Sequence, residues 1–115
     1  MIEIGIDIVS IKRIEHFINK YKQKALKRFL TQKEINLVKN SQNVASFWAA
    51  KEAFSKALGV GIGSKCSFLD IEILKDSYGK PFFTKSTLEK FNIKNSSLSI
   101  THDGGFVVAA VILVK

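Results

Sequence analysis

Residues 43–59, NVASFWAAKEAFSKALG, form the longest helical pattern in the sequence, and Gly59 is typical of the position just past a helix end. Most of this helix is apolar, which indicates that it is largely buried. Its polar side chains share one stripe, which we expect to face a cleft: Lys51, Glu52, Ser55 and Lys56. An i, i+4 pair such as Glu52 and Lys56 is by itself typical of a surface salt bridge. Its position before a glycine-rich segment favours a ligand site instead.

The segment before this helix begins with a clear strand pattern. Residues 2–9 alternate with period 2, so the isoleucines at positions 2, 4, 6 and 8 share one face, which we assign to the core. Asp7 lies on the opposite face, where a carboxylate has few structural roles. Ser10 is a suitable N-cap for a helix over residues 11–21, and Thr31 with Glu34 fits a capping box that opens a second short helix.

The segment after the helix contains mainly strands and turns. We expect strands over residues 68–75, 82–84, 97–102 and 106–114, and a short helix over residues 86–91. Asp103 and the two glycines that follow it predict a hairpin turn between the last two strands. The final strand is apolar on both faces, which indicates a subunit interface. The sequence therefore predicts a single α+β domain over residues 1–115, with a mostly antiparallel sheet packed with helices.

Composition and charge narrow the functional classes. The chain has 115 residues, a formal net charge of +8 and one cysteine, Cys66, so neither an intramolecular disulfide nor a cysteine-based zinc site can form. We find no signal peptide and no apolar run long enough for a membrane helix, and we expect a soluble cytoplasmic protein. Half of the Lys and Arg residues lie between positions 11 and 39. Such a block can simply solvate a helix face, or it can dock an acidic partner, either nucleic acid or an acidic protein.

Asp7 and Glu52 are candidates for a metal site. If the two carboxylates converge to about 4 Å, their repulsion costs on the order of 4 kcal/mol at an effective dielectric constant of 20, and a divalent cation removes that cost. Two carboxylates completed by phosphate oxygens and water are typical of Mg²⁺. Lys56 would then be a point charge for the same phosphate. His102, at a strand end beside glycines, is either structural or a ligand contact.

Three separated segments match one family. Gly5-Ile6-Asp7-Ile8-Val9, the motif from Trp48 to Gly59, and Ser99-Ile100-Thr101-His102 resemble the signatures of the bacterial holo-[acyl-carrier-protein] synthases, the small class of 4′-phosphopantetheinyl transferases. The middle segment is long and specific, and Gly79-Lys80-Pro81 also fits the Gly-x-Pro turn of the family. The resemblance spans nearly the whole chain and implies the 4′-phosphopantetheinyl transferase fold.

The resemblance implies transfer of 4′-phosphopantetheine from coenzyme A to a serine of apo acyl carrier protein, in fatty acid biosynthesis. Asp7 and Glu52 would hold Mg²⁺, and Glu52, Lys56 and Asp7 would be the catalytic residues. Substrate binding would involve four residues: Lys51, Lys56, Gly59 and His102. The acidic carrier would dock on Arg13, Lys20 and Arg28, and family members are homotrimers with sites between subunits. Glu52, Asp7 and a metal-bound water are all candidates for the base that deprotonates the serine.

Two positions depart from the family pattern. Phe47 stands where many members have an arginine that contacts the 3′-phosphate of coenzyme A, and Tyr78 stands where many have asparagine. Lys65 and Lys51 are the cations that could compensate. A nucleic-acid-binding module is the rival from another class; it explains the positive charge but neither Asp7 nor Glu52, and no nucleic-acid motif occurs. A third possible function is that of a catalytically inactive scaffold that keeps the fold.

Overall fold

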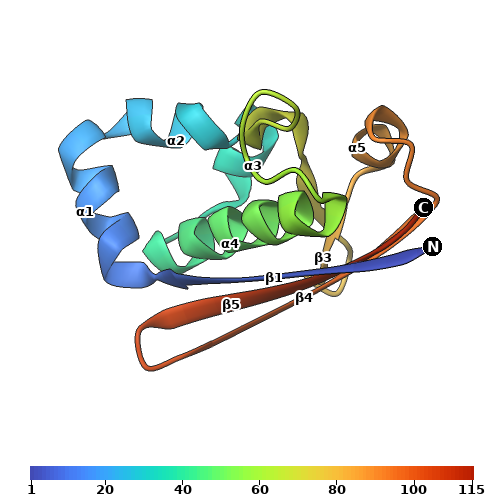
Figure 1. Ribbon diagram of the computed structural model, residues 1–115. Helices are drawn as coiled ribbons and strands as arrows, with labels where there is room; N and C mark the ends of the chain where they lie inside the picture. Colours follow the sequence, from blue (N-terminus) through green and yellow to red (C-terminus); the bar gives the residue numbers. More distant parts are fainter.

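A three-stranded antiparallel sheet and one long helix lying along it form the centre of the computed structural model, which describes all residues 1–115 (Figure 1). The strand order is β1 (Ile2–Ser10), β5 (Phe106–Val114), β4 (Asn95–Asp103), so β5 is central. The long helix α4 (Ser41–Leu58) packs mainly against β1 and β5. A second antiparallel pair, β2 (Ile73–Lys75) and β3 (Pro81–Phe83), lies beside β4. The α+β class with antiparallel sheets is confirmed.

Shorter helices surround α4: α1 (Ile11–Tyr21), α2 (Gln23–Phe29), α3 (Gln32–Leu37) and α5 (Lys85–Lys90). The predicted caps are confirmed. The hydroxyl of Ser10 accepts the Arg13 N–H at the start of α1, and Thr31 and Glu34 form a complete capping box on α3. Helix α2 was not predicted. Lys22, with a positive φ of 53°, reverses the chain between α1 and α2 and so separates two helices in one polar stretch.

The strand predicted over residues 68–75 is wrong in its first half. Phe68–Asp70 form a single 3₁₀ turn, η1, and only Ile73–Lys75 pair as a strand. The cause is local, because Ser67 and Asp70 cap each other: the Asp70 carboxylate accepts the Ser67 N–H at 3.0 Å, and the Ser67 side chain accepts in return. Short side-chain bonds of this kind compete with strand pairing.

The assignment of the isoleucine face of β1 to the core is also wrong. Ile2, Ile4, Ile6 and Ile8 are 71%, 71%, 61% and 62% exposed. The other face of β1, which carries Gly5, Asp7 and Val9, packs against α4. Alternation identifies two faces but does not say which one the helix covers. Asp7 therefore lies on the helix-covered side of the sheet.

The central strand β5 explains the apolar excess of the last segment. Val107, Ala109, Val111 and Leu113 are fully buried on the side of α4, whereas Phe106 and Ile112 on the other side are about half exposed. Together with the isoleucines of β1 they form an apolar surface that no element of this chain covers (Figure 1). We call this surface the open sheet face.

Candidate active site

Close packing between β1 and α4 builds the candidate site. A Cβ at Gly5 would collide with the carbonyl oxygen of Ala53 and would lie 2.7 Å from the backbone nitrogen of Ala57. Only a glycine therefore allows α4 to approach the strand this closely. Asp7, two residues further along the same face, is brought beside the polar stripe of α4.

Lys56 links the strand to the helix. Its ammonium donates to the Asp7 carboxylate at 2.9 Å and to the carbonyl of Ile6 at 3.2 Å. Lys56 thus forms its ion pair with Asp7 and not with Glu52, the partner that helical spacing suggests. The Lys56 side chain is 51% exposed and that of Asp7 is 15% exposed, so the ammonium can turn to a ligand while the carboxylate stays largely enclosed.

The charges of Asp7 and Lys56 both act on the pKa of Glu52. Burial raises the pKa of Glu52 above its usual value of 4.5, and the nearby Asp7 carboxylate raises it further, whereas Lys56 and Arg13 act in the opposite direction. A cleft of about 390 Å³, lined by Ile6, Asp7, Ile8, Lys56 and Val108, opens beside this cluster. The site therefore combines two interacting carboxylates with a half-exposed lysine side chain next to open space.

The protein side chains at this site would supply only some of the ligands that a metal ion needs. No group of three or more His, Cys, Asp or Glu side chains lies close enough together to hold an ion. Asp7 and Glu52 are the carboxylate pair that the sequence suggested, and the pKa of Glu52 is raised first by burial and then by the charge of Asp7. Two carboxylates fit Mg²⁺, because this ion usually binds one or two protein carboxylates and takes its other ligands from phosphates and water.

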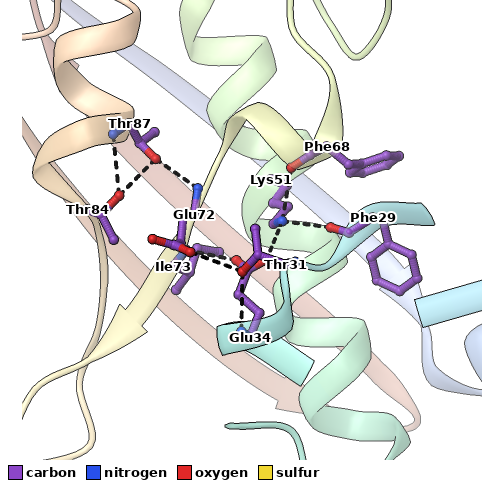
Figure 2. Close-up of polar contacts among 9 residues, drawn as sticks. All are labelled: Phe29, Thr31, Glu34, Lys51, Phe68, Glu72, Ile73, Thr84 and Thr87. Atoms are coloured by element: carbon purple, nitrogen blue, oxygen red, sulfur yellow. Dashed lines mark hydrogen bonds and ion pairs between the residues drawn. The ribbon is translucent and has the colours of Figure 1, made fainter. Parts of the chain in front are cut away.

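Lys51 does not belong to this site. Figure 2 shows its ammonium enclosed by three acceptors: the carbonyl of Phe29 at 2.6 Å, the Glu34 carboxylate at 2.7 Å and the carbonyl of Phe68 at 3.0 Å. Both side chains of the Lys51–Glu34 pair are fully buried, and burial lowers the pKa of Lys51 from its usual value. All three N–H bonds of the ammonium are used, so the prediction that Lys51 faces a cleft and binds substrate is wrong.

The Lys51–Glu34 pair instead joins several segments. The second oxygen of Glu34 accepts the N–H of Ile73 at the start of β2, and the first also accepts the N–H of Thr31 (Figure 2). One buried ion pair therefore connects α3 and α4 with β2, with the end of α2 and with the start of η1. Its role is structural.

His102 lies on the other side of α4. It lines a cleft of about 340 Å³ between the first turns of α4, the β2–β3 turn and the end of β4, and we call this the His102 cleft. The lining residues are Asn43, Ser46, Phe47, Lys75, Gly79, Pro81, Ile100 and His102. Phe47 and the Gly79–Pro81 turn, which the family resemblance brought up separately, both line this cleft. The sequence reasoning missed Lys75, since no motif distinguishes it from the other lysines.

Asp7 and His102 belong to opposite edges of the sheet. Asp7 is on β1 and His102 is on β4, with β5 between them, so the two edge strands are about 10 Å apart. The cleft beside Asp7 and the His102 cleft share no lining residue. The structure brings Asp7, Glu52 and Lys56 together but leaves His102 on the far edge.

The remaining predicted site residues lie at the two ends of the helical layer. Gly59 ends α4 with a φ of 91° and lines a polar hollow with Lys65, but its N–H already bonds to the end of α4. Lys20 and Arg28 both lie over the ring of Tyr21, at 5.3 and 5.2 Å from its centroid. Arg13 is about 10 Å from Lys20 along α1 and is close enough to Glu52 to affect its pKa.

Comparison with known proteins gives a consistent result. Residues 3–111 match the model of the 4′-phosphopantetheinyl transferase superfamily. The chain is 73% identical over 112 residues to the holo-[acyl-carrier-protein] synthase of Nautilia profundicola, which covers 97% of this chain and 99% of that protein. The crystal structure of the Helicobacter pylori synthase with coenzyme A has a TM-score of 0.89 and 50% identity, covering 96% of this chain and 98% of that one. The Bacillus anthracis synthase, solved with coenzyme A (3′,5′-ADP), has a TM-score of 0.82 and 43% identity, covering 96% and 94%. None of the helices combines the length and apolar character needed to cross a bilayer.

Proposed function

The chain belongs to the 4′-phosphopantetheinyl transferase superfamily and, within it, to the bacterial holo-[acyl-carrier-protein] synthases, and on this basis we propose that it transfers 4′-phosphopantetheine from coenzyme A to a serine of apo acyl carrier protein. The products are holo acyl carrier protein and adenosine 3′,5′-bisphosphate. The observation that carries the proposal is the meeting of Asp7, Glu52 and Lys56 beside a cleft. The reaction would serve fatty acid biosynthesis in the cytoplasm.

The chemical step is a phosphoryl transfer. The serine oxygen forms a bond to the phosphorus that carries pantetheine, and the bond from this phosphorus to the bridging oxygen breaks. The bridging oxygen leaves with adenosine 3′,5′-bisphosphate, and the serine proton passes to a base in the site. Negative charge collects on the leaving phosphate, and Lys56, whose ammonium is half exposed at the cleft, is suited to neutralise it.

Asp7 and Glu52 would hold a magnesium ion on the pyrophosphate of coenzyme A. The pKa of Glu52, which is raised by burial and further by the nearby Asp7 carboxylate, supports this assignment, because a cation would offset both effects. When bound, the ion would draw charge from the phosphoryl oxygens and so favour cleavage of the pyrophosphate. Asp7 already contacts Lys56 at 2.9 Å, so the pair would orient the ion and the ammonium toward the same phosphates.

Arg13, Lys20 and Arg28 would dock the carrier protein. Carrier proteins of this kind are acidic, and this chain has a net charge of +8, so long-range attraction would speed their encounter. Arg13 lies in the electrostatic range of Glu52, which supports docking of the acceptor serine close to the carboxylate pair. Lys20 and Arg28, gathered at Tyr21, would bind acidic side chains further from the reacting atoms.

The open sheet face supports assembly as a homotrimer. Four isoleucines that are more than 60% exposed are a large unpartnered apolar surface for a chain of this size. Asp7 and His102 lie on opposite edge strands and line separate clefts, which supports sites that each combine one edge from each of two copies of the chain. Contact between copies would cover the open sheet face and complete three equivalent sites.

Intact-protein mass spectrometry tests the proposal directly. Incubation with Mg²⁺, coenzyme A and apo acyl carrier protein is expected to add the mass of one phosphopantetheinyl group to the carrier, and EDTA should prevent the addition. Glu52→Gln should abolish the addition while the protein stays folded. Glu89→Gln, a matched change at a carboxylate that is 67% exposed, should have no effect. A carrier whose mass is unchanged with the wild-type protein would refute the transferase assignment.

A further inference from the structure

The largest cavity of the molecule is separate from both clefts of the candidate site. It has a volume of about 440 Å³ and lies between α1, α2 and the segment that leads into α4 (Figure 1). We call it the α1–α2 cavity. It shares no lining residue with the cleft beside Asp7 or with the His102 cleft. Its lining residue Val44 is eight residues before Glu52 on α4, which corresponds to about 12 Å along the helix axis, so a molecule bound here would not overlap the reacting groups.

The α1–α2 cavity also lies on a different side of α1 from the proposed docking residues. Consecutive residues of an α-helix are turned by about 100°, so the lining residue Ile18 lies about 140° around α1 from Arg13. By the same count Lys20 lies only about 20° from Arg13. The cavity is therefore not part of the surface that we assign to the carrier protein.

Aliphatic side chains supply the apolar part of the lining: Ile18, Leu26, Val38 and Val44. Val44 is buried and the other three are half-buried. Small-molecule sites are typically cavities of roughly 300–1,000 Å³ that combine such apolar residues with a few polar groups. No aromatic residue lines the cavity, so a flat ring would find no stacking partner there. The lining therefore favours an aliphatic group.

Two opposite charges line the same cavity. Glu15 and Lys39 are both exposed and do not form an ion pair with each other. One oxygen of Glu15 accepts the Ser41 hydroxyl at 3.0 Å, which holds the carboxylate at the cavity, and its other oxygen has no partner within the chain. The Lys39 ammonium has no partner either; only the backbone N–H of Lys39 is bonded, to the side chain of Asn43 at 3.0 Å. The cavity therefore offers one available carboxylate oxygen and one available ammonium beside aliphatic side chains.

We propose that the α1–α2 cavity binds a small aliphatic zwitterion of the α-amino acid class, with its ammonium on Glu15, its carboxylate on Lys39 and its side chain on the aliphatic lining. A neutral aliphatic molecule would leave both protein charges without a partner, and an alkylamine or a fatty carboxylate would pair only one of them. Hydrogen bonds between charged groups are roughly twice as strong as those between neutral groups, so the zwitterion is the ligand that this lining selects. The proposal does not depend on the transferase assignment.

Three small molecules of similar shape test the proposal. Heteronuclear NMR titration of the whole protein would measure binding of L-leucine, of isocaproate, which lacks the ammonium, and of isoamylamine, which lacks the carboxylate. We expect leucine to cause saturable shifts of the backbone signals of residues 15–19 and 38–44. Each analogue should bind about tenfold more weakly or worse, as expected for loss of one charge-assisted hydrogen bond.

Two charge-removing variants give a second readout. Glu15→Gln keeps an acceptor for the Ser41 hydroxyl and removes only the charge, so it should weaken leucine about tenfold and leave isocaproate unchanged. Lys39→Gln should weaken leucine equally and leave isoamylamine unchanged. Lys33→Gln and Glu89→Gln remove the same charges from exposed side chains outside the cavity and should bind leucine like the wild-type protein.

The proposal is overturned if leucine causes no saturable shifts, if the shifts centre on other residues, or if either analogue binds as tightly as leucine. Unchanged leucine affinity in Glu15→Gln or in Lys39→Gln overturns it as well. Because the titration uses neither coenzyme A nor carrier protein, such a failure leaves the proposed transferase activity untouched.

Discussion

Replacing Lys51 by methionine tests the buried ion pair. The change keeps an unbranched side chain in place but leaves the Glu34 carboxylate buried with only the N–H groups of Thr31 and Ile73 as partners. Removing one member of a buried pair typically costs about 3–5 kcal/mol. The total free energy of unfolding of such a domain is about 5–15 kcal/mol, so Lys51→Met should lose between about a fifth and all of it. At roughly 4 °C per kcal/mol, Tm should fall by about 12–20 °C.

Urea denaturation followed by circular dichroism, at one fixed protein concentration, would measure the loss. Lys85→Met is the matched control, because it breaks an exposed pair with Glu89 at 3.9 Å and should cost less than about 0.5 kcal/mol. Adding Glu34→Gln to Lys51→Met removes the orphaned charge, so the two changes together should cost about 2 kcal/mol less than their sum. Additive effects, or a Lys51→Met protein within 1 kcal/mol of the wild type, would refute the structural role.

Three further variants test other parts of the structure. Gly5→Ala places a methyl group against the backbone of Ala53, so we expect a loss of about 3 kcal/mol or more in urea denaturation, whereas Gly63→Ala, which meets nothing within 4 Å, should be neutral. Ile6→Glu should turn a trimer into monomers in sedimentation velocity while leaving the far-UV spectrum intact; an unchanged sedimentation coefficient would contradict our assignment of the open sheet face. Because the raised pKa of Glu52 means that its ionised form destabilises the fold, stability is lost as pH rises from 4.5 through that raised pKa. Glu52→Gln should therefore have a higher Tm than the wild type at pH 7 in metal-free buffer, and this gain should vanish toward pH 4.5. Equal Tm values at pH 7 would contradict the claim that the ionised Glu52 carboxylate destabilises the fold.

Local signals predicted the elements that have strong patterns. Helix α4 and strand β5 are long, apolar and bounded by glycines, and the caps at Ser10 and Thr31 depend only on near neighbours. Helix α2 has seven residues with three apolar side chains among them, which is too short for periodicity to be distinguished from a polar loop.

The contacts in the candidate site depend on which helices and strands lie next to each other. Sequence periodicity does not contain this information. Carboxylate chemistry and the family resemblance both pair Asp7 with Glu52, yet the strand can approach the helix that carries Glu52 only because Gly5 has no side chain. Lys51 and Lys56 belong to the same helical stripe, but Lys51 meets Glu34 from α3, and Lys56 meets Asp7 from β1. The same pattern thus yields one structural and one candidate catalytic lysine.

The order of the strands has a consequence for how the protein is made. Strand β5 is the middle of the sheet, yet a ribosome synthesises it after β1, α4 and β4. Until β5 emerges, β1 and β4 have no partner strand in this sheet, and α4 lacks one of the two strands that it packs against. Pairing between residues as distant as Ile2 and Val114 is slow, and incomplete chains of this kind expose aggregation-prone edges. The core of the domain is therefore completed only when the central strand of the sheet has been synthesised.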